Sequence, residues 1–119
     1  MIAREIVTAE ALDLESPGRR DYHIALPHDS IWGDHLIPLT VLVGRETAPG
    51  QGLVAFGSTH GNEYEGPIAL HHLLRAFDLN RVRGRIILVP VLNPAAFRAG
   101  ARDSVGEDGV NLNRAFVPG

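Results

Sequence analysis

Apolar residues fall into short runs that predict strands in the first half of the chain. Residues 20–27 and 36–43 are rich in strand-forming side chains, and the segment between them carries turn-forming Asp, Ser and Gly residues. Residues 53–56 form a short, continuous apolar run, which is typical of a strand that is buried on both faces. We therefore expect two strands joined by a loop, followed by a third, fully buried strand.

The hydrophobic spacing changes after Pro67, a residue that suits the first turn of a helix. Apolar positions at i, i+3, i+4 and i+7 place one apolar stripe along a helix. These positions are occupied by Leu70, Leu73, Leu74 and Phe77. Residues 86–92 are again continuously apolar apart from one proline, which predicts another fully buried strand.

A strand, a helix and a strand in succession predict a parallel crossover, and hence an α/β fold. In such sheets ligands bind outside the carboxyl ends of the strands. Here those ends are the polar loops that start at Gly57 and at Asn93. After Asn93 the chain has no clear period and is rich in glycine, so it is expected to be loop-like.

Composition narrows the class of protein. The chain has 119 residues, 45% of them hydrophobic, which suits one domain with one core. Its 11 basic and 14 acidic residues give a net charge of -3, so nothing indicates a nucleic-acid partner. No apolar run is long enough to span a membrane, and the first residues do not resemble a signal peptide. We expect a soluble, cytoplasmic protein.

The absence of cysteine restricts the chemistry further, because it excludes disulfides, thiolate nucleophiles and sulfur-rich zinc sites. A metal ion would have to be held by nitrogen and oxygen. His60 and Glu63, three residues apart in the first polar loop, could chelate one zinc ion if the loop folds back on itself. The alternative is a solvated histidine and an exposed glutamate, since so short a pattern also arises by chance.

The second polar segment includes the guanidinium groups of Arg102 and Arg114, the latter within the run Asn111-Leu112-Asn113-Arg114. Arginine presents a planar fork that can hold a carboxylate by two parallel hydrogen bonds, which suits recognition of an amino acid. The alternative is a surface loop whose charges only make the protein soluble.

These segments, taken in order, resemble the succinylglutamate desuccinylase/aspartoacylase family, which is related to zinc carboxypeptidases. The similarity covers roughly residues 52–119 and is more specific than any single motif. The matching segments are residues 57–63 (GSTHGNE), Asn93-Pro94 with Ala96, Arg102, and residues 113–116 (NRAF) ahead of Pro118-Gly119.

The resemblance implies a carboxypeptidase-like α/β fold with a mixed sheet, a zinc cofactor and an N-acyl amino acid as the small-molecule substrate. His60 and Glu63 would be two of three protein ligands to the zinc. Arg102 would polarise the carbonyl oxygen of the scissile amide. Asn113 and Arg114 would bind the substrate carboxylate. Asn111 stands where the family often has an Asp that orients the zinc-binding histidine, and it can accept the same hydrogen bond without the charge.

The family's third ligand, a histidine, and its catalytic glutamate lie further downstream than residue 119. We therefore expect the chain to be the N-terminal part of a zinc deacylase domain, with a strand-rich segment (residues 1–48) before the metal- and substrate-binding half (residues 52–119). An incomplete sheet would leave an open edge, so self-association is expected.

Three alternatives stay open. The chain could be a non-catalytic domain that binds carboxylates and holds metal weakly or not at all. It could be an enzyme that is completed by a second polypeptide. Within the enzyme class, it could belong to a metallocarboxypeptidase, because both reactions cleave an amide next to a carboxylate.

Overall fold

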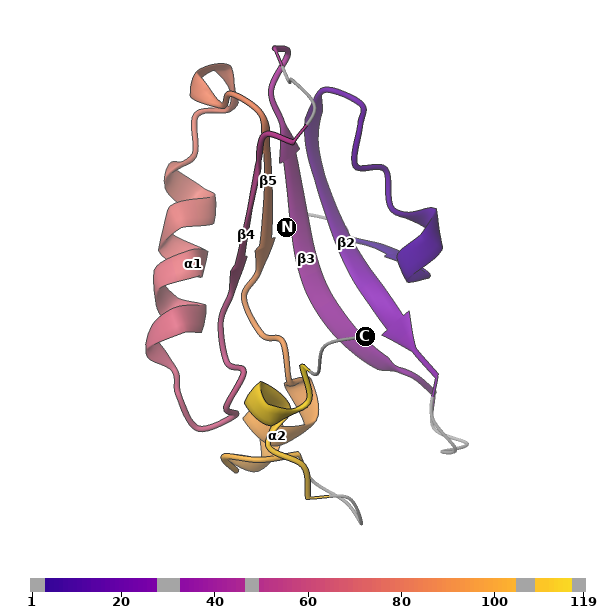
Figure 1. Ribbon diagram of the computed structural model, residues 1–119, viewed down its shortest axis with the longest axis vertical. Helices are drawn as coiled ribbons and strands as arrows, with labels where there is room; N and C mark the ends of the chain where they lie inside the picture. The colour runs from indigo at the N-terminus through magenta and orange to yellow at the C-terminus, as the bar shows by residue number, and fades with distance from the viewer. Residues whose placement is uncertain (1–3, 28–32, 47–49, 105–108, 117–119) are drawn as a thin grey trace.

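The computed structural model describes residues 4–27, 33–46, 50–104 and 109–116. Part of the loop expected after residue 27 and the Pro118-Gly119 pair lie outside these residues. The described residues form an α/β fold around one mixed five-stranded sheet, in the order β1-β2-β3-β5-β4 (Figure 1). None of its helices is long and apolar enough to cross a membrane.

The first two predicted strands are confirmed and form an antiparallel pair. They are β2 (Gly18–Leu26) and β3 (His35–Val43), with Tyr22 opposite Leu39. A three-residue strand, β1 (Glu5–Val7), runs parallel to β2, and the sequence did not predict it. A short 3-10 helix, η1 (Ala9–Ala11), follows it.

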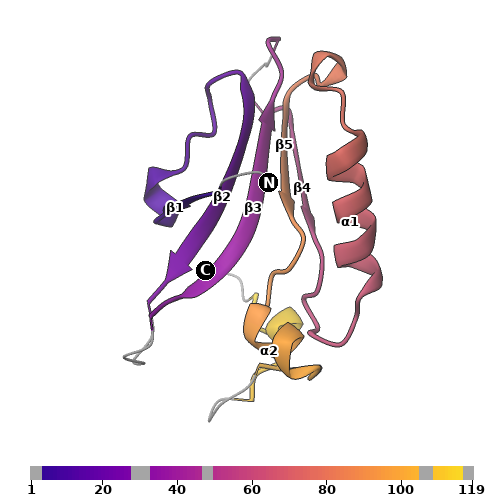
Figure 2. The ribbon, with the colours of Figure 1, turned by 180° about the vertical axis from the view of Figure 1, so that it is seen from behind.

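The predicted crossover is also confirmed. Strand β4 (Gly52–Phe56), helix α1 (Glu65–Ala76) and strand β5 (Arg85–Val89) follow one another, and β4 and β5 are parallel. The 3-10 helix η2 (Leu79–Arg81) links α1 to β5. Helix α1 covers one face of the sheet, whereas the N-terminal segment lies against the other face (Figures 1 and 2).

The prediction that residues 53–56 are buried on both faces is wrong. Strand β5, rather than β4, pairs with β3, so β4 lies at the edge of the described sheet. Leu53 is 58% exposed, and Val54 and Phe56 are exposed as well. The central strand is β3, whose Val41 is fully buried.

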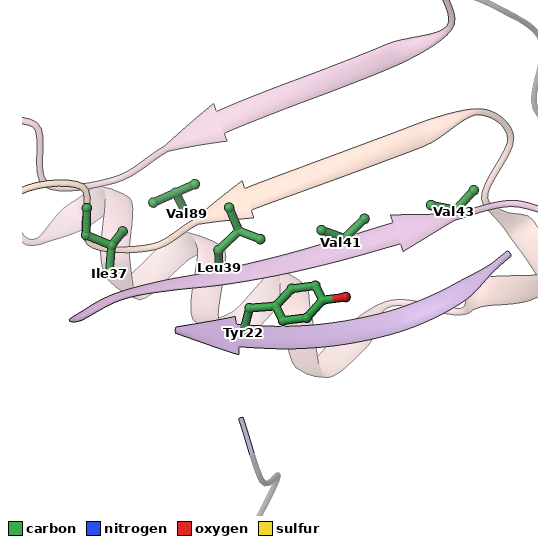
Figure 3. Packing of buried hydrophobic residues seen from close by; sticks show 6 residues of the cluster. All are labelled: Tyr22, Ile37, Leu39, Val41, Val43 and Val89. Carbon is green, nitrogen blue, oxygen red and sulfur yellow. The ribbon is translucent and has the colours of Figure 1, made fainter. Parts of the chain in front are cut away.

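The core lies on both faces of β3. On one face Tyr22, Val41 and their neighbours pack together (Figure 3), and Val7, Leu12 and Leu14 of the N-terminal segment pack against them. On the other face Leu42 and Leu88 pack against Leu74 of α1, with Leu70 and Phe77 beside them. The predicted helical stripe is therefore confirmed except at Leu73, which points away from the core and is exposed.

A second helix, α2 (Pro94–Ala99), occupies part of the segment that was expected to be loop-like. The side chain of Asn93 caps its start by accepting a hydrogen bond from the Ala96 amide, at 3.2 Å. Gly100 ends the helix in the left-handed conformation. Together with η3 (Leu112–Arg114), this helix lies below the carboxyl ends of β4 and β5 (Figure 1).

A polar cluster around Asp21 joins the sheet to α1. Thr40 donates a hydrogen bond to the Asp21 carboxylate at 2.6 Å, and Arg19 donates two at 3.0 and 3.2 Å. Arg19 also donates to the carbonyl of Leu74 in α1. Burial raises the pKa of Asp21, but the hydrogen bonds from Arg19 and Thr40 and the nearby positive charges outweigh it, so the pKa lies below its usual range.

We predict that Asp21→Asn lowers the free energy of unfolding by about 1–3 kcal/mol at neutral pH, because charge-assisted hydrogen bonds to a buried group are lost. Because the pKa of Asp21 is lower in the folded state, its ionised carboxyl group stabilises the fold at pH values above its unfolded-state pKa of about 3.9. This contribution disappears as the pH falls through the folded-state pKa. Urea unfolding should therefore show a large difference in the free energy of unfolding between the two proteins at pH 7 and a small difference at pH 3.

The control is Glu46→Gln, which removes an exposed ion pair with Arg83 and should change stability by less than about 1 kcal/mol. Equal effects of the two substitutions would contradict the role given to Asp21.

Candidate functional site

The pairing of β4 with β5 continues beyond the ends of both strands. The amide of Gly57 donates to Val89 at 2.8 Å, the amide of Leu92 donates to Gly57 at 2.9 Å, and the amide of Asn93 donates to Ser58 at 3.2 Å. The two loops expected to bind a ligand are therefore fastened side by side at one edge of the sheet.

Two glycines make this close packing possible. A Cβ atom on Gly57 would lie 2.4 Å from the carbonyl oxygen of Pro90. A Cβ atom on Gly61 would lie 2.2 Å from the backbone of Ala96 in α2. Both contacts are with backbone atoms that cannot move aside easily, so the first loop can press against its neighbours only because these positions have no side chain.

His60 and Glu63 face each other in the first loop. The amide of Glu63 donates to the carbonyl of His60 at 3.2 Å, which closes a turn between the two residues. The Nδ1 atom of His60 lies 3.1 Å from Oε1 of Glu63. The His60 side chain is 12% exposed and that of Glu63 is 53% exposed, so the pair is open to solvent on the carboxylate side.

Asn111 contacts the other nitrogen of the His60 ring. Oδ1 of Asn111 accepts a hydrogen bond from the amide of Asn113 at 3.1 Å, which identifies this atom as the oxygen of the amide group. The same oxygen lies 3.0 Å from Nε2 of His60. Oε1 of Glu63, which faces Nδ1, is an oxygen as well, so the two ring nitrogens of His60 lie between two oxygen atoms.

This arrangement fits a divalent zinc ion. In a tetrahedral site with bonds of about 2.0–2.2 Å, two ligand atoms lie about 3.3 Å apart. The 3.1 Å between Nδ1 of His60 and Oε1 of Glu63 is close to that separation. No group of three or more His, Asp or Glu side chains that could hold a metal occurs among the described residues.

Arg102 lies beside the pair. Its carbonyl accepts a hydrogen bond from the Gly61 amide at 3.1 Å, which ties the Arg102 backbone to the first loop. Its Nη1 atom donates to Oε1 of Glu63 at 3.1 Å. Half of the Arg102 side chain is exposed, so the guanidinium group can also reach a ligand that approaches from solvent.

Asn113 and Arg114 lie in η3, which Asn111 connects to His60. Both side chains are exposed, and neither forms a hydrogen bond or an ion pair with another described residue. The structure thus brings His60, Glu63, Arg102 and Asn111 into contact with one another. It places the other two predicted residues on an adjoining helix without fixing the direction of their side chains.

Two further residues support the site, and the sequence reasoning did not assign them this role. Ser58 is buried directly after β4, with a φ angle of 51°. Asn93 is expected from the sequence to begin a ligand-binding loop, and in the structure its side chain also caps α2 and donates to Ser104 at 3.3 Å. The combination of Asn93, Pro94 and Gly100 is a recognisable signal for the start and end of a helix.

A family model of the succinylglutamate desuccinylase/aspartoacylase catalytic domain matches residues 49–118, which is more than half of the chain. The chain belongs to this family. The resemblance inferred from the motifs is thereby confirmed.

Individual relatives support the same assignment. An N-alpha-acetyl-L-2,4-diaminobutyric acid deacetylase from Halomonas elongata is 40% identical over 108 residues, which cover 88% of this chain and 30% of the relative. The product-bound structure of the ectoine utilization protein EutE (DoeB) from Ruegeria pomeroyi is 43% identical, with a TM-score of 0.76, over 89% of this chain and 32% of that one.

A succinylglutamate desuccinylase/aspartoacylase from Rhodobacter sphaeroides is 33% identical, with a TM-score of 0.77, over 88% of this chain and 32% of that one. The predicted carboxypeptidase-like α/β fold with a mixed sheet is confirmed. The chain spans about a third of the length of the relatives it matches.

Proposed function

We propose that this chain provides two ligands of a zinc ion, together with the arginines that bind the substrate, in a hydrolase that removes the acyl group from an N-acyl amino acid. The observation that carries the proposal is the His60–Glu63 pair, whose facing Nδ1 and Oε1 atoms lie 3.1 Å apart at the carboxyl edge of the sheet. The family, and the activity for which the Halomonas elongata deacetylase is named, support the class of substrate.

His60 and Glu63 would hold the zinc, which would supply Lewis acidity toward the amide and toward an attacking water molecule. Asn111 would accept a hydrogen bond from Nε2 of His60 and so orient the ring, which leaves Nδ1 to bind the metal. The third ligand and the glutamate that moves the proton would come from residues other than the described ones, either later in a longer chain or in a second polypeptide. The cytoplasmic location stays a prediction.

Arg102 would bind the carbonyl oxygen of the scissile amide. Its guanidinium group lies 3.1 Å from Oε1 of Glu63 and is half exposed, so it is held next to the zinc position and faces solvent. Negative charge develops on that oxygen during acyl transfer, and a fixed cation stabilises it. Arg114 and Asn113, exposed on η3, would bind the substrate carboxylate.

The test of the metal site is calorimetric titration of the purified chain with Zn²⁺. We expect binding weaker than at a three-ligand site, and its loss in His60→Ala, because one of only two ligands is removed. His72→Ala is the matched control, since His72 is exposed on α1 away from the pair. Zinc binding that persists in His60→Ala would contradict the assignment of His60 as a ligand.

The test of the substrate site uses a longer form of the protein that is active. Arg114→Ala should raise KM for N-acyl amino acids about 10- to 100-fold, because a charge-assisted hydrogen bond is lost. For the corresponding amides without an α-carboxylate, KM should hardly change. Arg83→Ala, at the exposed pair with Glu46, should affect neither substrate. Equal losses for both substrates in Arg114→Ala would argue against carboxylate binding.

We also propose that the isolated chain self-associates through β4. This strand is at the edge of the described sheet, its sequence Gly-Leu-Val-Ala-Phe carries no charge, and three of its apolar side chains are exposed. Such an edge offers unpaired backbone groups to another strand, and natural proteins usually protect it with a charge.

Sedimentation velocity should therefore show concentration-dependent association of the 119-residue chain, and Val54→Lys should reduce it by placing a charge on the edge strand. Ile68→Lys is the control, because Ile68 is similarly exposed but lies on α1. A chain that is monomeric at every concentration, or an equal effect of both substitutions, would rule out association through β4.

A further inference from the structure

Ser58 is the only residue other than glycine with a positive φ angle in the described part of the chain. Its φ of 51° lies in the left-handed region, where the Cβ atom of an ordinary residue crowds the backbone. Strain of this kind persists when the surrounding structure holds the residue in place, and it is common at functional sites.

The backbone carbonyl and the side chain of Ser58 both form hydrogen bonds with residues of the site. Its carbonyl accepts the hydrogen bond from the Asn93 amide at 3.2 Å, which joins the two loops. Its side chain is buried, at 5% exposure, and Oγ donates to the carbonyl of His60 at 3.2 Å, with the carbonyl of Gly61 at 3.5 Å. The residue thus connects the neighbouring loop to the turn that carries the two metal ligands.

The carbonyl of His60 is the point on which these contacts converge. It accepts one hydrogen bond from the Ser58 hydroxyl and another from the Glu63 amide, both at 3.2 Å. The second bond closes the turn that brings the two ligand side chains together. Because the hydroxyl of Ser58 donates to the same carbonyl, it restrains the orientation of the peptide between His60 and Gly61.

Glycine at position 58 would adopt the same backbone conformation without strain. What serine adds is therefore the hydroxyl group, and that group makes its contacts within the ligand turn. We propose that Ser58 is a positioning residue, whose hydroxyl sets the distance between His60 and Glu63 and thereby the affinity for the metal. The part that concerns metal rests on the proposed function.

The experiment compares Ser58→Gly with Ser58→Ala in the 119-residue chain. Both substitutions remove the hydroxyl, so we expect both to weaken Zn²⁺ binding in calorimetry, by roughly 10-fold. Their effects on stability should differ. Glycine relieves the strained φ, so the midpoint of thermal unfolding should stay the same or rise, whereas alanine keeps the strain and should lower it.

Weaker zinc binding in a Ser58→Gly protein of undiminished stability is a result that a purely structural role would not give. Undiminished zinc affinity in that variant would overturn the proposal. Should the unaltered chain bind no zinc, the proposed function fails, and hydrogen exchange of the Glu63 amide then decides the positioning role. That amide should exchange faster in both variants, and an unchanged exchange rate would overturn the inference.

Discussion

The site depends on the hydrogen bonds that extend the pairing of β4 and β5 past the ends of the strands. Three backbone bonds, from Gly57 to Val89, from Leu92 to Gly57 and from Asn93 to Ser58, hold the two loops at a fixed separation. Because side chains alternate along a strand, a shift of one residue in this register would turn the loop to the other face of the sheet. The register of the sheet therefore determines where the loop that carries His60 lies.

Two oxygen atoms in the site each contact two polar groups. Oδ1 of Asn111 contacts the His60 ring and the Asn113 amide, and Oε1 of Glu63 contacts the His60 ring and the Arg102 guanidinium group. Such sharing links the groups that would bind metal, carbonyl and carboxylate, so that moving one of them disturbs the others. Effects of substitutions at these positions are accordingly expected to be non-additive.

The crossover could be predicted from the sequence because the hydrophobic period of each strand and helix is visible within a short stretch of the chain. The sequence could not distinguish an edge strand from a central one, because an apolar run such as residues 53–56 occurs in both. The pairing of β5 with β3 joins residues that are far apart in the sequence, so the local pattern does not reveal it. Helix α2 was missed because six residues are too short for a period, although Asn93 and Gly100 signalled its ends. The contact of His60 with Asn111 could be anticipated only from family resemblance, not from spacing.

The two contacts of the His60 ring close chain loops of very different size. The partner Glu63 is 3 residues away, whereas the partner Asn111 is 51 residues away. Loop-closure entropy grows with the logarithm of length, so the second contact carries about 2–3 kcal/mol more of unfavourable chain entropy than the first. The Nδ1 and Oε1 atoms can thus meet while the chain is still largely unfolded, but the contact with Asn111 requires that the crossover and the segment beyond α2 have come together.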